Sequence, residues 1–267
     1  MSSISEVTRS QDSNNLREIL ARQLLMHSRS EKLSVIRNAM EGTDRDAVLK
    51  MMASMGFQHD LRHYHADSHA LKNMDWWEIV YHPHPVSQSY THSNTRQPLH
   101  CDNAWFSDAP ELNLFIMEKQ APTGGEQVLY PVSLLLEDLQ RDQPALLKLL
   151  VETAVIIRKG NEYGMWNETT ILKLGSQPKV FWNYYRIQKD TSKVADMCEC
   201  FFQFLEKRML SGDLPQLRAE DGDLFFFNDQ LVLHGRLAFE AKDLADRMLL
   251  QSSWRLPDPA FRGQNHS

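Results

Sequence analysis

The segment PLHCDNAW, residues 98–105, gives the first indication of both the fold and the chemistry of this chain. On an extended strand alternate side chains point to opposite faces, so His100 and Asp102 share one face and Cys101 points the other way. One imidazole and one carboxylate on the same face can occupy two neighbouring positions on a single metal ion. The segment therefore predicts a strand that carries two metal ligands and needs a third from elsewhere.

A third ligand is available in FFFNDQLVLHGRLAF, residues 225–239, where His234 ends an apolar run typical of a buried strand. Two histidines and one carboxylate leave three positions free on an octahedral ion, which is the arrangement of non-haem Fe(II) oxygenases. Zinc stays an alternative, although catalytic zinc usually keeps one open position. A His-X-Asp triplet alone is common by chance, and a surface turn is the simpler explanation of it.

Arg247 stands thirteen residues after His234 and opens RMLLQSSW, residues 247–254, another strand-like run. A hairpin between His234 and Arg247 would bring the Arg247 guanidinium back beside the metal. 2-Oxoglutarate chelates iron through its 2-oxo and C1 carboxylate groups, and its far carboxylate then needs a fixed cation. A bidentate arginine suits that geometry best.

Short β-prone runs separated by Pro, Gly, Asn and Asp fill the chain from residue 57 onward. They are Glu78–Tyr81, Leu112–Met117, Gln127–Tyr130, Ala154–Arg158, Lys179–Tyr185, Asp223–Phe227, Leu231–Leu233 and Met248–Trp254. Helical patterns interrupt them at Leu134–Leu150 and Thr191–Leu210. We expect a mainly β (α+β) fold, a jelly roll with N-terminal helices and helical insertions.

The N-terminal part has a different pattern, since LREILARQLL and EKLSVIRNAM both place apolar residues at helical spacing. Asp44 is placed to cap a helix over Arg45–Met55, which Gly56 would end. We expect a single domain over 1–267, with 1–56 as a helical cover and 57–267 as the jelly-roll core.

Composition is that of an ordinary globular protein, with 42% hydrophobic and 24% charged residues and a formal charge of −6. The absence of a basic stripe predicts no nucleic-acid partner, and no apolar run reaches the ~20 residues that span a bilayer. The polar N-terminus lacks the apolar core of a signal peptide. With only three cysteines, Cys101, Cys198 and Cys200, these features predict the cytoplasm.

The chain resembles the TauD/TfdA group of Fe(II)/2-oxoglutarate dioxygenases, which includes taurine dioxygenase, γ-butyrobetaine hydroxylase and the clavaminate-synthase-like enzymes. The likeness lies in LHCDNAW (99–105), APTGGEQVLYP (121–131), NDQLVLHGRLAF (228–239) and DRMLLQSSW (246–254), in the family's order. It implies a double-stranded β-helix, Fe(II) on His100, Asp102 and His234, and 2-oxoglutarate on Arg247. O2 would be the oxidant, a small molecule such as an amino acid or specialised metabolite the substrate, and succinate and CO2 the products.

Two positions depart from the family pattern and one agrees with it. Gln127 stands where many members have a threonine that bonds the same carboxylate, and it can still donate a hydrogen bond. Gln251 replaces the second arginine of taurine-type members, which argues against sulfonate recognition. Because Asp102 keeps the carboxylate that related halogenases lack, hydroxylation or a related C–H oxidation is favoured over halogenation.

Other residues carry weaker expectations. Arg96 shares alternation with His100 and is expected to face the pocket, with Trp105 and Tyr185 as further substrate contacts, whereas Arg236 is expected to fix local backbone. We expect structural or exposed roles for His63, His65, His69, His82 and His84, and irregular, lid-like segments over 57–76 and 86–97.

Two alternatives stay open. The same three ligands would serve a zinc-dependent hydrolase, and a non-catalytic jelly-roll protein could bind a metal or a sugar. The zinc hydrolase would not need Arg247 or 2-oxoglutarate. No interface pattern is legible, which leaves a homo-oligomer open.

Overall fold

The computed structural model describes residues 3–9, 16–65, 70–84, 90–159 and 165–258. Its helices are α1 (Leu16–His27), α2 (Arg45–Ser54), η1 (Tyr90–His92, a 3₁₀ turn), α3 (Val132–Asp142), α4 (Pro144–Glu152) and α5 (Ser192–Leu210). Its strands are β1 (Ile4–Thr8), β2 (Leu33–Arg37), β3 (Gln58–Asp60), β4 (Arg62–His65), β5 (Ala70–Asn73), β6 (Trp77–Val80), β7 (Gln97–His100), β8 (Leu112–Lys119), β9 (Gln127–Pro131), β10 (Ala154–Arg158), β11 (Trp166–Thr170), β12 (Leu172–Lys173), β13 (Lys179–Val180), β14 (Gln216–Leu217), β15 (Leu224–Asn228), β16 (Val232–Arg236) and β17 (Met248–Arg255).

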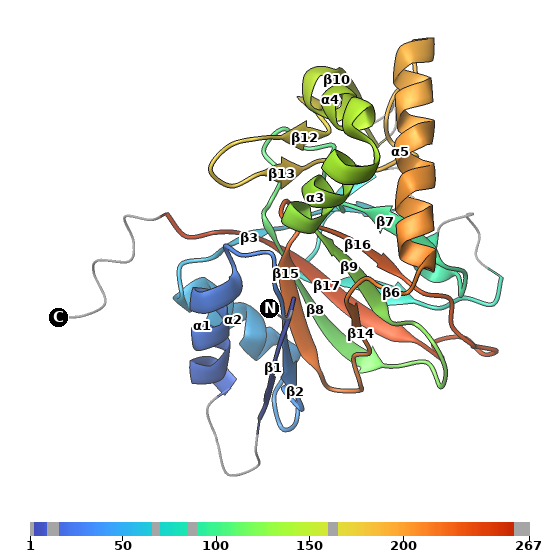
Figure 1. The fold of residues 1–267 in the computed structure, drawn as a ribbon. Helices are drawn as coiled ribbons and strands as arrows, with labels where there is room; N and C mark the ends of the chain where they lie inside the picture. Colours follow the sequence, from blue (N-terminus) through green and yellow to red (C-terminus); the bar gives the residue numbers. More distant parts are fainter. Residues whose placement is uncertain (1–2, 10–15, 66–69, 85–89, 160–164, 259–267) are drawn as a thin grey trace.

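Two sheets form the body of the protein. The larger has the order β1-β2-β15-β8-β17-β3, with β6 also paired to β17, and the smaller has the order β14-β9-β16-β7. Helices α1 and α2 lie against the larger sheet, while α3, α4 and α5 lie on the side of the smaller one (Figure 1). The predicted strand-rich fold with N-terminal helices and helical insertions is confirmed.

Strand alternation decides which side chains enter the space between the sheets. On β15, Leu224 and Phe226 pack in the cluster with α1 and α2, whereas Phe225 and Phe227 pack in the cluster shared with the smaller sheet. The same rule holds on β8, where Phe115 belongs to the shared cluster. We call the positions on this shared side the inner face; it carries the candidate site.

The N-terminal region is only partly as expected. Asp44 caps α2 by accepting the N–H of Asp46, and Gly56 follows the helix at φ +83°, as predicted. The expectation of a helix in EKLSVIRNAM is wrong, because residues 33–37 form β2, parallel to β1 and antiparallel to β15. A short run of consecutive apolar residues fits either periodicity, and pairing inside the sheet buries both of its faces here.

The helical insertions also differ in detail from the prediction. Leu134–Leu150 is two helices, since Pro144 begins α4 and its ring and missing N–H cannot continue α3. α5 matches its predicted range and is capped by the Thr191 side chain. Strand structure in Lys179–Tyr185 is confined to β13.

The smaller sheet contains one unusually close approach. Gly235 on β16 packs so tightly against β7 that an added Cβ would lie 2.7 Å from the Gln97 carbonyl oxygen. Contacts under 3.0 Å require one strand to move. Only glycine therefore lets β16 and β7 approach to this distance, and these two strands carry His234 and His100.

We predict that Gly235→Ala destabilises the fold by about 1–3 kcal/mol, as overpacked sites do, and weakens metal binding by displacing one histidine from the other. Chemical unfolding and a metal titration measure the two effects. The matched control is Gly175→Ala, since nothing lies within 4 Å of an added Cβ there. Equal behaviour of the two variants would contradict this account of the strand pair.

Candidate metal centre

The predicted triad comes together because β7 and β16 are neighbours. His100 and His234 are register partners, and their ring centroids lie 4.3 Å apart. Asp102 Oδ1 lies 3.2 Å from His100 Nε2, and its Oδ2 lies 3.4 Å from His234 Nε2. Within the described part of the chain this is the one group of three or more His, Cys, Asp or Glu side chains with metal-ligand spacing.

Both imidazoles turn their Nε2 atoms toward the Asp102 carboxylate. The Nδ1 of His100 lies 2.8 Å from the Pro98 carbonyl oxygen, which only a protonated Nδ1 can satisfy. The Nδ1 of His234 lies 3.4 Å from the carboxylate of Asp229. Because Nδ1 of each ring faces such a partner, the two Nε2 atoms and the Asp102 carboxylate are the candidate metal ligands. This set of nitrogen and oxygen ligands suits Fe(II) or zinc.

Two amides hold the Asp102 carboxylate, a role that the sequence indicated for neither of them. Its Oδ2 accepts hydrogen bonds from Asn113 Nδ2 at 2.9 Å and from Gln251 Nε2 at 2.7 Å. Both donors are buried on the inner face, on β8 and β17. A lone polar residue at an inner position of the apolar strand LNLFIM is the signal that could have revealed Asn113.

The charges around the triad are strongly coupled. Burial raises the pKa of Asp102, but His234 and His100 outweigh it and hold that pKa well below its usual range. Burial lowers the pKa of His234, yet Asp102 and Asp229 raise it to about 10. Burial also raises the pKa of Asp229, and the charge of Asp102 adds to the rise. The two buried carboxylates, Asp102 and Asp229, thus favour a positive charge between the imidazoles, and a divalent metal ion would supply it.

Arg247 lies at the other end of the inner face. Its Nε donates to Gln120 Oε1 at 3.3 Å, while its buried Nη2 has no hydrogen-bond partner among the described residues. Burial lowers the pKa of Arg247 to about 10, and the charge of Arg218 contributes. The guanidinium therefore stays protonated near neutral pH with an unused donor, which suits a bound anion.

The neighbours of Arg247 have mostly structural contacts. Arg236 donates from Nη2 to the carbonyl oxygens of Tyr90, Ser93 and Thr95, so its predicted role in fixing backbone is confirmed. Gln127 is buried on β9 and is the register partner of Arg236. Gln127 therefore lies at the same end of the inner face as Arg247.

The expected orientation of Arg96 is wrong. A bulge between β7 and β16 sets His234 opposite His100 but Arg236 opposite Gln97, so β7 has one extra residue in this interval. The extra residue turns Gln97 inward, where its amide lies 3.1 Å from His100 Nε2. The guanidinium of Arg96 instead forms an ion pair with Glu206 on α5.

The two aromatic candidates have different surroundings. Trp105 is buried near the triad segment, with the Lys159 ammonium 4.0 Å from its ring centroid. It also borders a surface hollow of about 260 Å³ with Phe106 and Trp166. Tyr185 is 53% exposed, and its hydroxyl lies 2.6 Å from that of Tyr90.

Among the described residues, no other histidine belongs to a group with metal-ligand spacing. His82 and His84 are exposed, as expected. His63 and His65 belong to β4, and His69 lies outside the described residues. The segment 57–76, expected to be irregular, contains β3, β4 and β5 instead, while 86–89 of the second expected lid are not described.

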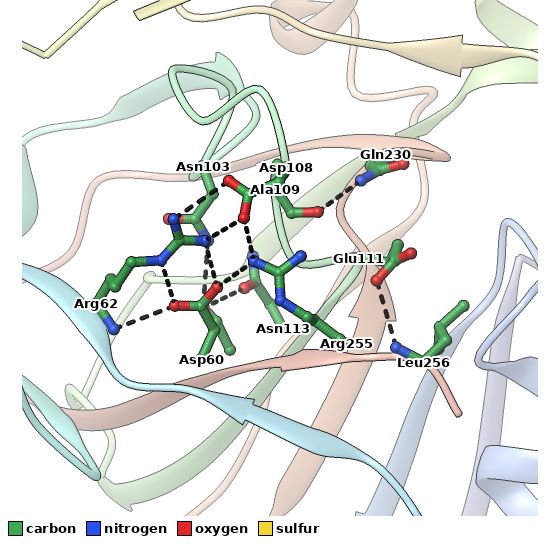
Figure 2. A network of polar contacts seen from close by, with 11 residues as sticks. Asp60, Arg62, Asn103, Asp108, Ala109, Glu111, Asn113, Gln230, Arg255 and Leu256 are labelled. Atoms are coloured by element: carbon green, nitrogen blue, oxygen red, sulfur yellow. Dashed lines mark hydrogen bonds and ion pairs between the residues drawn. The ribbon is translucent and has the colours of Figure 1, made fainter. Parts of the chain in front are cut away.

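An ion-pair network anchors the loop that follows the triad segment. Figure 2 shows Asp60 and Asp108 between Arg62 and Arg255, beside Asn103 and Asn113. Bonds from Arg62 outweigh the burial of Asp60 and lower the pKa of that carboxyl. Asn103 continues the network by donating to Ser253 Oγ at 3.2 Å. The backbone that presents Asp102 is thereby tied to β3 and β17.

Solved structures share this fold. Asparagine oxygenase is 14% identical, with a TM-score of 0.69 over 95% of this chain and 94% of that one. PvcB from Pseudomonas aeruginosa is 15% identical, with a TM-score of 0.64 over 95% and 86%. The non-haem iron oxygenase OrfP is 15% identical, with a TM-score of 0.62 over 95% and 84%. No curated protein matches the chain.

Among the described residues, no helix has both the length and the apolar character needed to cross a membrane. A family model, taurine catabolism dioxygenase TauD, TfdA family, matches residues 7–254. The match confirms the predicted enzyme class, the Fe(II)- and 2-oxoglutarate-dependent dioxygenases. The chain belongs to the TauD, TfdA family.

Proposed function

We propose that this dioxygenase hydroxylates, or otherwise oxidises at a C–H bond, a small amino acid, with release of succinate and CO2. His100, Asp102 and His234 hold Fe(II), and Arg247 holds the far carboxylate of 2-oxoglutarate. The observation that carries the proposal is the buried Arg247 with an unused Nη2 donor on the same inner face as the triad. A metal-binding protein without an anionic co-substrate has no use for such a cation.

The spacing along β17 supports this division of roles. Arg247 immediately precedes the strand and Gln251, which bonds Asp102, lies four residues later. At about 3.3 Å per residue this is ~13 Å along the chain, and both side chains extend into the space between the sheets. A five-carbon dicarboxylate that chelates the metal and reaches back toward Arg247 fits this interval.

An amino acid substrate is supported by the structural neighbours and by one lysine. Asparagine oxygenase was solved with hydroxyasparagine, and OrfP with hydroxyarginine. In this chain the position of the second arginine of taurine-type members is Gln251, which is neutral and bonded to Asp102. The substrate carboxylate therefore needs a cation from elsewhere. We assign that role to Lys159, whose ammonium lies over Trp105. Burial and the charge of Arg186 hold the pKa of Lys159 well below its usual range, and a bound carboxylate would favour its protonated form.

We place the reaction in the cytoplasm. All three cysteines are free, and two of them, Cys101 and Cys198, are buried. Free thiols and ferrous iron both fit a reducing compartment.

The direct test is succinate formation from 2-oxoglutarate with Fe(II), ascorbate and a panel of amino acids, with and without O2. We expect turnover that requires iron and oxygen, and its loss in His100→Ala and Asp102→Ala. Hydrolysis of any substrate with zinc alone, without 2-oxoglutarate, would instead support the hydrolase alternative.

For Arg247→Ala we expect 2-oxoglutarate to bind at least about 10-fold more weakly, because a hydrogen bond to a charged group contributes about 1.5–3 kcal/mol. Arg247→Lys should recover only part of this, since it keeps the charge but loses the planar fork. Arg208→Ala is the control, because Arg208 is half-buried and paired with Asp138. Unchanged 2-oxoglutarate affinity in Arg247→Ala would remove this residue from the proposal.

For Lys159→Met we expect a raised KM for the amino acid with little change in 2-oxoglutarate affinity, since the variant removes a charge beside Trp105 only. The control is Lys189→Met, because Lys189 makes a similar contact, 3.5 Å from the Tyr184 ring centroid, at an exposed site. Steady-state kinetics with each ligand varied in turn separate the two effects. A higher KM for 2-oxoglutarate instead would contradict the assignment.

A further inference from the structure

Asp229 touches both segments that supply the triad, although it is not one of its members. It lies between β15 and β16 and is 3% exposed. Its carboxylate oxygens accept the backbone N–H of Asp102 at 3.2 and 3.0 Å, and that of Asn103 at 3.5 Å. Its Oδ1 also lies 3.4 Å from His234 Nδ1.

We infer that Asp229 is a positioning residue that assembles the metal centre before the ion binds. Its carboxylate faces His234 Nδ1, which orients the ring with Nε2 toward the triad, and it fixes the backbone that presents Asp102. This inference rests on the proposed function, because it assumes that the triad binds a divalent cation.

The chemistry of the ligand explains why a carboxylate stands here. A metal-bound histidine usually donates its other ring N–H to a carboxylate or carbonyl, which sets the ring orientation and raises the basicity of the ligand nitrogen. The two histidines of this centre differ in that respect. His100 Nδ1 hydrogen-bonds the neutral Pro98 carbonyl at 2.8 Å, whereas His234 Nδ1 makes a 3.4 Å ion-pair contact, without hydrogen-bond geometry, with the Asp229 carboxylate. The negative charge of Asp229 should make His234 the stronger of the two nitrogen donors.

The burial of Asp229 has a second consequence. Among the described residues, no lysine or arginine pairs with its carboxylate, and its ion-pair contact is with His234. A dication bound at His234 would add positive charge beside this buried carboxylate and stabilise it. Ion binding and the folded position of Asp229 therefore favour each other.

The test is a Co(II) titration of the metal-free, full-length protein, followed by the visible absorption of the bound ion. We expect Asp229→Ala to weaken Co(II) binding by about 10- to 100-fold, the usual effect of losing such a partner. Asp229→Asn, which keeps an acceptor but loses the charge, should weaken it less. Asp138→Asn is the control, since Asp138 is equally buried but bonds Tyr130 and Arg208.

Proton NMR of the Co(II)-loaded protein separates positioning from general stability. The wild type should show two paramagnetically shifted, exchangeable imidazole N–H signals, one from each histidine. In Asp229→Asn the His234 signal should move or exchange faster, while the His100 signal, held by Pro98, stays as an internal reference. Both signals unchanged, with wild-type Co(II) affinity, would overturn the inference.

Failure of the proposed function has a different signature. In that case the wild type itself would not bind Co(II). Alternatively, the wild type and the Asp229 variants would bind Co(II), but none of them would bind 2-oxoglutarate. Asp229→Asn keeps the shape of the side chain, and thermal unfolding by circular dichroism verifies that it folds.

Discussion

The antiparallel pairing of β7 with β16 is the constraint on which the rest of the site depends. It sets His100 opposite His234, and the absence of a side chain at Gly235 allows the two strands to approach closely enough. Asp102 follows β7 directly and is held from the opposite sheet by Asn113 and Gln251. The centre therefore needs both sheets of the sandwich, and any change in their spacing moves a ligand.

Charge is distributed unequally along the space between the sheets. Carboxylates gather at the triad end, where Asp102 and Asp229 are both buried. Buried arginines gather at the other end, where Arg247 and Arg236 lie close enough for the charge of Arg247 to lower the pKa of Arg236. A dianion that chelates a dication at one end and meets a guanidinium at the other neutralises both. This polarity is a physical reason for a metal and a dicarboxylate to bind together.

Alternation and order along the chain were enough to predict that His100, Asp102 and His234 come together and that the fold is strand-rich. Alternation failed for Arg96, because a bulge is invisible in sequence and reverses every side chain beyond it. Periodicity failed for EKLSVIRNAM, because a short apolar run fits a helix or a buried strand equally well. Asp229 was missed because it acts through a contact between segments far apart in the chain, which no local pattern records. Gln97 was missed because the bulge turns it inward, and Asn113 because its polar side chain within an apolar strand was overlooked.

The central claim is that one centre binds Fe(II) and 2-oxoglutarate together, and it can be tested without knowing the substrate. Under anaerobic conditions, a 2-oxo acid chelated to Fe(II) absorbs visible light by charge transfer from the metal. This account predicts such a band in the wild type when both iron and 2-oxoglutarate are added, saturating at one equivalent of each, and none in Asp102→Ala. No band at saturating concentrations of both would contradict the account.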